Sequence, residues 1–400
     1  MTTYTPPVFV NDTAPYLSAA TLNSVMTALK LVSNVYEIPT LPTDGTTDCT
    51  ALIQASIDAV ASKAMPGMKF QNSSGAFQFG ATAPGGGIVQ LPAGVFTVST
   101  LNLGHGVHLR GVGRRGTVLL QKAATTGAVI QNSSTHAQQV QISDLTVHGN
   151  KANQTAANAG IILSGNSTNN YTDPLDEDYD LGGRISNVYV ILCKGDGIRL
   201  TGAGADFVSD VKIRSCDGVG IFCFQDNHLH NVDVGWSGGH GVVVDGESCT
   251  LTNVKSWYSG AVTAGSAGFW LTADSGAMSA CNAQDNKGPG FLWDGAFGWT
   301  CSALLSDSNS RGSAGVYPAF DIYGSSYNQI SGTARNRYNA SYNGTTTVAE
   351  QAPAVRVRNS SASNIVHLVA ATGVWGQSTT YVQTGSTITG NTVVVNGVTQ

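Results

Sequence analysis

A six-residue segment that recurs along the middle of the chain decides the fold. It reads ISDLTV at 142–147, ISNVYV at 185–190, VSDVKI at 208–213, LHNVDV at 229–234 and, one residue shorter, LTNVK at 251–255. The central residues of the last four copies are Val188, Val211, Val232 and Val254, which follow one another in steps of 23, 21 and 22 residues. Apolar and polar residues alternate within each copy, as in a strand. A strand that returns about every 22 residues predicts a solenoid with one coil per repeat.

A second strand keeps the same step along the chain. Its copies begin at Gly197-Ile198, Gly220-Ile221, Gly241-Val242, Gly268-Phe269 and Gly290-Phe291. The positions expected to point inward are Ile198 and Leu200, Ile221 and Cys223, Val242 and Val244, Phe269 and Leu271, and Phe291 and Trp293. Stacked coils lie about 4.8 Å apart, so these side chains should form continuous apolar columns. We therefore expect an all-β parallel β-helix whose core is built by the repeat itself.

Polar and small residues keep the same register. One column holds Asp144, Asn187, Asp210, Asn231 and Asn253, directly before the central hydrophobic residue. Stacked amides and carboxylates can satisfy the backbone of a turn, so this column is interpreted as a structural ladder. A second column holds Cys193, Cys216, Ser237 and Ser259. Their small side chains predict a tight corner, and the seven scattered cysteines are expected to be reduced and mainly buried.

The region before the repeats resembles the N-terminal end of a known group of β-helix proteins. An Asp-Gly turn at 44–45 precedes a helix expected at about 50–64, with Asp48 placed to cap it and Leu52 expected on its apolar side. The helix is followed by a strand that begins with three glycines, then by LPAG at 91–94 and by RGVG at 110–113. This order resembles the pectate-lyase-superfamily β-helices, which implies a right-handed parallel β-helix. Because the first coil has no neighbour below it, the helix is expected to cover its open edge.

The first 40 residues are expected to form a separate unit. A Pro-rich arm is followed by a short amphipathic helix, and residues 9–23 resemble the opening segment of many phage tail and tail-fibre proteins. The resemblance implies attachment to the virion and contact with other tail or baseplate proteins. We therefore expect three regions: an attachment arm at 1–40, a β-helix at 41–370, and a C-terminal β segment at 371–400 that caps the β-helix or drives trimerisation.

Composition limits the possible partners. The formal charge of -5 leaves no basic excess for nucleic acid. No run of about 18 apolar residues occurs, so membrane insertion is not expected, and the first seven residues lack the pattern of a signal peptide. Neutral sugars remain compatible with this composition. The expected location is a virion tail assembled in the host cytoplasm.

Acidic residues gather where one coil is enlarged. The step from Ile161 to Ile198 is 37 residues instead of about 22. The insertion contains Asp173, Asp176, Glu177, Asp178 and Asp180. Carboxylate oxygens suit calcium, for which Asp173, Asp176, Asp178 and Asp180 are candidates, but the spacing matches no known calcium loop. A solvated acidic loop is the alternative, and no other cofactor is expected.

The turns before the second strand carry the candidate catalytic residues. Asp196, Asp217 and His240 lie at outward positions there, with Lys194 expected beside Asp217 on the adjacent coil. Two carboxylates can act as general acid and base on a glycosidic bond. The alternative is an ion pair and isolated turn carboxylates. The segment 239–241 also resembles a short polygalacturonase motif, but the paired aspartates and the Arg-Ile-Lys segment that should accompany it are absent.

Two further sets of residues are candidates for binding. The expected ligand-binding residues are Asp176, Glu177, Asp226, His228 and Asp245. Outward positions of the second strand form an apolar stripe of Phe222, Val243, Trp270 and Leu292. Such a stripe usually marks an interface, so we expect a homotrimer, with cover by a loop or the C-terminal segment as the alternative. The matching row of the first strand, Tyr189, Lys212, Asp233 and Lys255, is mixed and is expected to face solvent.

Three functions are consistent with these features. The first hypothesis is a phage tailspike or tail-fibre-like protein that binds a host surface polysaccharide, with or without cleaving it. The second is a polysaccharide lyase or glycoside hydrolase of bacterial origin. The third is a purely structural tail component that binds no glycan.

Overall fold

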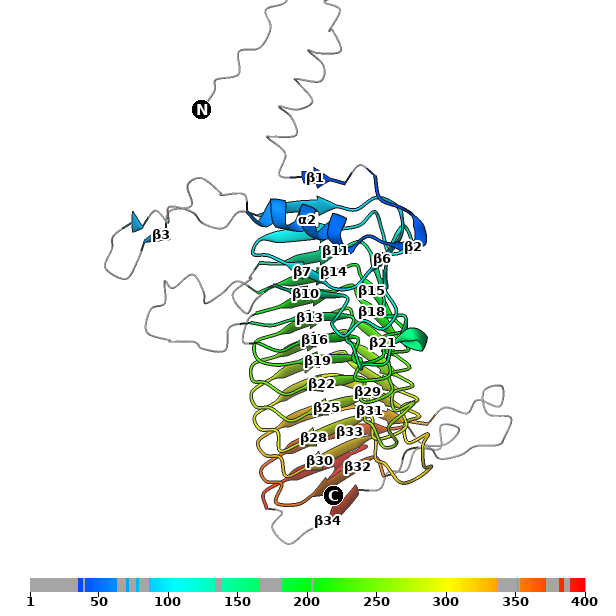
Figure 1. Cartoon of the computed structure of the whole chain (residues 1–400). Helices are drawn as coiled ribbons and strands as arrows, with labels where there is room; N and C mark the ends of the chain where they lie inside the picture. The colour runs from blue at the N-terminus through cyan, green and yellow to red at the C-terminus, as the bar shows by residue number, and fades with distance from the viewer. Residues whose placement is uncertain are drawn as a thin grey trace, which may run out of the picture.

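The chain forms a right-handed parallel β-helix. The computed structural model describes residues 35–38, 40–62, 70–71, 77–78, 86–133, 139–165, 182–202, 205–336, 351, 353–371, 381–384 and 389–399. Each coil contributes one strand to each of three parallel sheets, and successive coils stack into a column with the cap helix near one end (Figure 1). The expected fold is confirmed.

The first sheet runs the length of the column and has 11 strands. They are β7 (Leu101–Leu103), β10 (Ile130–Asn132), β13 (Ile161–Leu163), β16 (Ile198–Leu200), β19 (Ile221–Cys223), β22 (Val242–Val244), β25 (Phe269–Leu271), β28 (Phe291–Asp294), β30 (Phe320–Tyr323), β32 (Val355–Arg358) and β34 (Tyr381–Thr384). Ile161 pairs with Ile198, so the expected insertion leaves the stacking of this sheet intact.

The second and third sheets complete each coil. The second sheet contains β1 (Val35–Glu37), β5 (Gly87–Gln90), β8 (Val107–Arg110), β11 (Gln141–Ser143), β14 (Arg184–Ser186), β17 (Phe207–Ser209), β20 (His228–His230), β23 (Thr250–Thr252), β26 (Ala277–Ser279) and β35 (Thr392–Val395). The third contains β2 (Asp44–Asp48), β6 (Gly94–Val98), β9 (Thr117–Gln121), β12 (Thr146–His148), β15 (Tyr189–Ile191), β18 (Lys212–Arg214), β21 (Asp233–Gly235), β24 (Lys255–Trp257) and β27 (Asn282–Gln284). Three longer strands, β29 (Thr300–Asp307), β31 (Gln329–Arg335) and β33 (Ile365–Ala370), take part in both.

The expected apolar columns are all present. Val188, Val211, Val232 and Val254 are each at most 1% exposed. Backbone hydrogen bonds from the next coil reach the carbonyl of each of them, which places all four on one line. In the first sheet Ile198 pairs with Ile221, and Ile221 pairs with Val242. The 22-residue step therefore predicted the core columns correctly. The expectation of one alternating strand per six-residue copy was wrong, because each copy forms two short strands, such as β14 and β15, joined by a left-handed turn at Asn187.

The turn between the second and third sheets explains the polar ladder. Asp144, Asn187, Asp210, Asn231 and Asn253 all have φ between 52° and 58°. Asn and Asp tolerate this left-handed conformation better than most residues. Side chains also link successive coils: Asn187 donates to Asp144 at 2.7 Å, and Asn231 donates to Asp210 at 2.6 Å. The structural interpretation of this column is confirmed.

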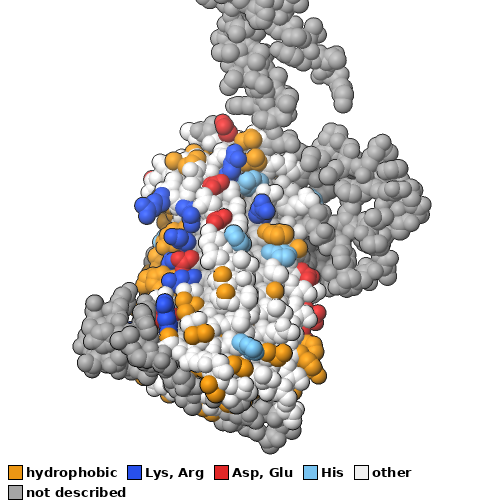
Figure 2. Space-filling model, turned by 180° about the vertical axis from the view of Figure 1, so that it is seen from behind, with side chains coloured by type: hydrophobic (Ala, Val, Ile, Leu, Met, Phe, Trp, Pro, Cys, Tyr) orange, Lys and Arg blue, Asp and Glu red, His pale blue; other side chains and the backbone are white. Residues whose placement is uncertain are grey.

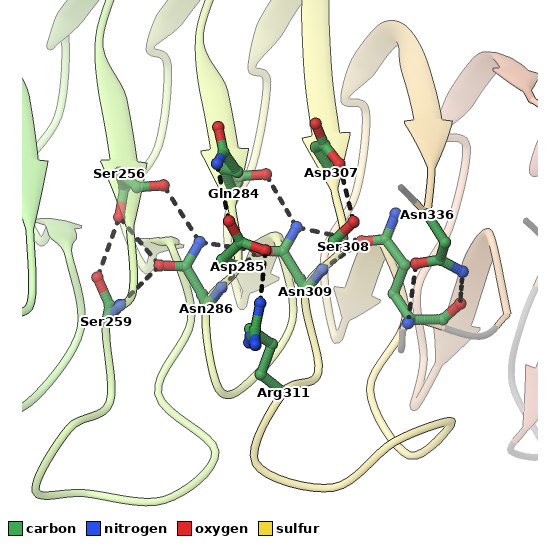
Figure 3. Close-up of polar contacts among 12 residues, drawn as sticks. Ser256, Ser259, Gln284, Asp285, Asn286, Asp307, Ser308, Asn309, Arg311 and Asn336 are labelled. Carbon is green, nitrogen blue, oxygen red and sulfur yellow. Dashed lines mark hydrogen bonds and ion pairs between the residues drawn. The ribbon is translucent and has the colours of Figure 1, made fainter. Parts of the chain in front are cut away.

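A buried polar ladder continues the corner that cysteines form in earlier coils. Asn286 donates to the side-chain oxygen of Asn309 at 2.8 Å, and Gln351 Oε1 accepts from Asn309 at 3.1 Å (Figure 3). On the preceding coil, the backbone N–H of Ser259 donates to Asn286. Cys193 and Cys216 occupy the equivalent positions nearer the N-terminus, and all seven cysteines are free and buried, as expected.

Helix α2 (Thr50–Ala61) closes the N-terminal end of the column (Figure 1). Its buried residues are Ile53, Ser56, Ile57 and Val60. The N-cap residue is Cys49 and not the expected Asp48, although Asp48 accepts hydrogen bonds from the backbone N–H and the hydroxyl of Thr50. The expected helix was three residues too long, and Leu52 is 52% exposed, so its placement on the apolar side was wrong. Residues three and four apart share a face of a helix, so Ile53, Ser56, Ile57 and Val60 form the buried stripe, and Leu52 lies outside it.

Several smaller elements complete the described chain. They are the 3₁₀ turn η1 (Lys151–Asn153), the antiparallel pair β3 (Phe70–Gln71) and β4 (Phe77–Gln78), and β36 (Val398–Thr399), which folds back on β35. Strands β34 and β35 pair in parallel with β32 and β33, so coil stacking extends beyond residue 371. The expected attachment arm lies outside the described residues except for 35–38 and residue 40, and the three-part division of the chain stays a prediction.

Candidate functional site

Three aromatic side chains lie together on the third sheet and the turn that follows it. Trp236 follows β21, and Trp257 and Tyr258 lie at and after the end of β24, one coil further along. The Trp236 and Trp257 rings are 4.1 Å apart, and Trp236 stacks on Tyr258 at 5.7 Å with nearly parallel planes. Trp236 is 44% exposed, and the other two are half-buried. We call Trp236, Trp257 and Tyr258 the aromatic cluster.

The backbone of the repeat presents these rings outward. Trp236 and Tyr258 have φ of 55° and 54°, and Leu192 and Ser215 adopt the same conformation on earlier coils. The turn after the third sheet therefore requires the left-handed region whatever residue occupies it. Such a conformation costs roughly 1 kcal/mol for a residue with a side chain, and strain of this kind often accompanies functional sites.

Gly235 makes room for the indole of Trp257. A Cβ atom on Gly235 would lie 2.7 Å from Trp257 Cε2 and 2.9 Å from its Nε1. The indole thus packs flat against the backbone of the neighbouring coil. Its N–H donates to Asp233 Oδ1 at 2.7 Å, which fixes the rotation of the ring.

Charged groups surround the aromatic cluster. Arg214 forms an ion pair with Asp233 Oδ2 at 2.5 Å and lies over the Trp257 ring at 4.9 Å. Arg311 lies over Tyr258 at 5.1 Å and pairs with Asp285 at 3.0 Å, a contact visible in Figure 3. In Figure 2, Lys and Arg side chains gather in a file along one edge of the face shown, with acidic and hydrophobic side chains among them.

This arrangement suits a ligand that is apolar on one side and polar at its rim. Exposed tryptophan and tyrosine rings offer flat apolar faces with polar edges. The guanidinium and carboxylate groups beside them offer directional hydrogen bonds in fixed positions. A sugar ring presents C–H bonds on one face and hydroxyl groups around its edge, so it matches both parts of the cluster.

Asp196 and Asp217, two of the expected catalytic residues, lie where the repeat predicts. Lys194 pairs with Asp217 across coils at 3.2 Å, as expected, and Lys151 adds a second ion pair at 2.8 Å. Burial raises the pKa of Asp217, but hydrogen bonds from the two lysines outweigh burial and hold this pKa below its ordinary value. A carboxyl with a lowered pKa is a poor general acid at neutral pH.

Asp196 and His240 have partners of their own. Asp196 accepts hydrogen bonds from the Val219 backbone at 2.7 Å and from Arg199 at 2.5 Å. His240 stacks on Trp270 at 4.4 Å, and burial lowers the pKa of His240 to about 4. His240 is therefore neutral at pH 7. The catalytic roles of Asp196, Asp217 and His240 stay predictions.

The described members of the expected ligand-binding set lie at the corner between the first and second sheets on adjacent coils, and their role in binding stays a prediction. His228 stacks on Phe207 at 4.5 Å on the second sheet, whereas Asp226 and Asp245 lie in turns after first-sheet strands. Asp176 and Glu177 lie outside the described residues, as do the calcium candidates Asp173, Asp178 and Asp180. Within the described ranges, no group of three or more His, Cys, Asp or Glu side chains is arranged to hold a metal ion.

The apolar stripe of the first sheet is partly covered within the chain. Val243 is only 4% exposed, and Phe222, Trp270 and Leu292 are half-buried. Arg199 lies over Phe222 at 4.5 Å, and Asp294 accepts from the Trp270 indole at 3.0 Å. Polar side chains from neighbouring positions thus cover part of this surface, and its role as an oligomer interface stays a prediction.

Sequence reasoning missed the aromatic cluster. The row of Lys212, Asp233 and Lys255 was expected to face solvent, and the corner after it was predicted from Ser237 and Ser259, the residues that directly follow Trp236 and Tyr258. A signal was present, because Trp236 and Tyr258 each lie four residues after the central valine of their repeat. Equal offsets on adjacent coils place two side chains in one column, so this aromatic pair could have been found from the register alone.

Solved structures with a similar fold include a polysaccharide epimerase module and phage tailspikes. A mannuronan C-5 epimerase A-module from Azotobacter vinelandii is 17% identical, and the match covers 88% of this chain and 97% of the module with a TM-score of 0.61. Tailspike protein 2 of an Escherichia coli O157:H7 bacteriophage is 16% identical over 81% of this chain, with a TM-score of 0.62. An Acinetobacter phage tailspike is 12% identical over 92% of this chain, with a TM-score of 0.60.

The chain spans only part of these tailspikes, 41% of the first and 64% of the second. No protein-family model and no curated protein sequence matches the chain. At 12–17% identity these likenesses show the fold alone. None of the helices in the described part of the chain has the length and apolar character needed to span a bilayer.

Proposed function

We propose that this β-helix is a bacteriophage tail protein that binds a host surface polysaccharide through the aromatic cluster. The observation that carries the binding proposal is the group of Trp236, Trp257 and Tyr258, held outward on adjacent coils and bordered by ordered charged groups. Exposed aromatic clusters are costly in water and usually mark a binding site. The rigid solenoid fixes their spacing, so little ordering is required when a glycan binds.

Two further observations support the proposal. Several structures with the same fold are tailspikes, and others are epimerases whose name identifies the polysaccharide mannuronan as substrate. Residues 9–23 also resemble the opening segment of phage tail proteins. The tailspike likenesses and the segment at 9–23 favour a tail protein over a polysaccharide lyase or glycoside hydrolase of bacterial origin. A purely structural tail component would not need aromatic rings held beside paired charges at its surface.

An array of purified bacterial capsular and O-antigen polysaccharides tests the binding proposal. We expect the wild-type protein to bind at least one polymer. Trp257→Ala should weaken that binding by roughly 30-fold, because a central aromatic contact contributes on the order of 2 kcal/mol. Gly235→Ala should weaken it by about tenfold although every aromatic residue remains, because the added Cβ displaces the indole. Affinities are measured by biolayer interferometry on the bound polymer.

Tyr327→Ala is the matched control. Tyr327 is an aromatic residue that is 58% exposed at a left-handed turn of a later coil, with φ of 59°. Its removal should leave the affinity unchanged. Failure of the wild-type protein to bind any arrayed polymer, or equal affinities for wild type and Trp257→Ala, would overturn the proposal.

Cleavage of the bound glycan is tested separately by incubating the protein with the polymer that it binds. New reducing ends or unsaturated uronates would show depolymerase activity, and loss of that activity in Asp217→Asn with retained binding would assign a catalytic role to Asp217. Binding without any released product would leave recognition as the function of this surface.

We also propose that the protein is a homotrimer packed through the apolar stripe. Light scattering after size-exclusion chromatography should give a mass of about 124 kDa, three times the 41.3 kDa of the chain. Trp270→Glu should shift the mass towards that of one chain, because a charge would be buried in the interface. A wild-type mass near 41 kDa would contradict the trimer.

A further inference from the structure

Two lysines beside the aromatic cluster lack the ion pairs that their positions suggest. In the third sheet Lys212 and Lys255 are the cross-strand neighbours of Asp233, one on each side. Opposite charges at such positions normally pair. Here both oxygens of Asp233 are already used, by the Arg214 guanidinium and the Trp257 indole.

Among the described residues neither ammonium group has an ion-pair partner, so both can meet a ligand. Lys212 is exposed, and Lys255 lies 5.8 Å from the centre of the Trp257 ring, on the border of the aromatic cluster. Stacked strands are about 4.8 Å apart, so the two stems leave the sheet roughly 10 Å from each other. The two lysines flank Asp233, whose carboxylate is already paired with Arg214.

The local charge differs in sign from that of the whole protein. Arg214, Lys255 and Arg311 contact the rings and Lys212 is the cross-strand neighbour of Asp233, which gives four positive charges against two negative charges from Asp233 and Asp285. The result is a local excess of +2 on a chain whose formal charge is -5. Because Arg214 pairs with Asp233 and Arg311 with Asp285, the excess comes from the two lysines. A surface that concentrates unpaired cations on an acidic protein attracts anions selectively.

We infer that the aromatic cluster takes a carboxylated glycan, with Lys212 and Lys255 binding its carboxylates while the rings hold the sugar faces. This inference rests on the proposed function and names its substrate class. A uronic or other acidic sugar combines the apolar ring face and the anionic group in one residue. A neutral glycan would leave both ammonium groups without a role in recognition.

Matched polymers test the inference. Polygalacturonate, hyaluronate and acidic capsular polysaccharides are arrayed beside the same polymers after their carboxyl groups have been reduced to alcohols. Wild type should bind at least one acidic form more tightly than its reduced form. Each of Lys212→Gln and Lys255→Gln should weaken binding of the acidic form about 2- to 5-fold, as for a partly exposed ion pair, and leave the reduced form unchanged. About 0.5 M NaCl should weaken wild-type binding and remove the difference between the forms.

Lys122→Gln is the control, because Lys122 is an exposed lysine near the N-terminal end of the column, where it pairs with Asp48. Its removal should not alter either affinity. Equal binding of acidic and reduced polymers, with both lost in Trp257→Ala, would overturn the inference and leave the proposed glycan binding intact. Binding of no polymer by wild type would overturn both.

Discussion

Replacing Val254 with Asp should prevent the chain from reaching its folded state. Val254 is 1% exposed and continues the line of Val188, Val211 and Val232, which Cys281 and Leu304 extend. The substitution removes apolar packing and places a carboxylate where no partner exists in the described core. Burying an unpaired charge costs about 3–5 kcal/mol, and the lost packing adds about 1–2 kcal/mol. Together these are comparable to the whole stability of many domains.

The matched control lies two residues away on the same coil. Thr252 is exposed on the outer face of β23, so Thr252→Asp adds the same charge to the surface. Urea unfolding followed by tryptophan fluorescence should show near-native stability for Thr252→Asp and little or no folded Val254→Asp. Equal stability of the two variants would mean that the residue at 254 does not lie in a shared core.

Asp206→Asn should stabilise the protein at neutral pH and have little effect in acid. Asp206 is buried in the turn before β17, where it accepts a hydrogen bond from the backbone of Gly183 at 2.5 Å. Burial raises the pKa of Asp206 to about 7. Asn328 and Asn364 make the equivalent bond on later coils, accepting from Trp299 and Asn328, so an amide suits this position.

The pH window follows from the direction of this shift. The carboxyl ionises in the unfolded chain near its ordinary value of 3.8, but only near 7 in the folded chain. Between these values the folded state holds more protons, so wild-type stability falls as pH rises. The gain from Asp206→Asn should grow across this window to at most about 4 kcal/mol above pH 7. Urea unfolding from pH 4 to pH 8 measures it, and a difference that does not change with pH would contradict the assignment.

Much of the architecture could be predicted because the repeat encodes it. The positions of the buried valines, the glycine-initiated strands and the left-handed polar column all follow from register and alternation. Each coil contacts mainly its neighbours, so a local pattern determines the global arrangement. The insertion between Ile161 and Ile198 could also be recognised, since the strands on either side keep their pairing.

Apart from the Trp236 and Tyr258 pair, which keeps the register, the parts of the site do not repeat and could not be predicted in the same way. Carboxylates in turns suggested chemistry, but the partners that decide their charge come from neighbouring coils, as Lys151 does for Asp217. The apolar stripe of the first sheet was expected to be exposed. Alternation along a strand predicts which side of the sheet a side chain lies on, but it does not predict which other side chains cover that side. The aromatic cluster required attention to the corner after the strand, where Trp257 packs over Gly235.

In the proposed function, each part of the aromatic cluster and its surroundings contributes to glycan binding. The left-handed corner presents the rings, Gly235 and Asp233 orient the Trp257 indole, and the flanking cations meet the rim of the ligand. Because the cluster lies on adjacent coils of a rigid column, an extended polymer can follow the long axis across several coils. Recognition of a repeating glycan by a repeating protein needs no large conformational change.

The most direct test of glycan recognition by the aromatic cluster is a crystal structure with a bound oligosaccharide. The oligosaccharide is prepared from the polymer that binds most tightly on the array and is soaked into crystals of the protein. We predict sugar density stacked on Trp236, Trp257 and Tyr258, with polar contacts to the charged groups at its edge. Well-defined sugar density on another surface, with these three rings uncovered, would contradict the account.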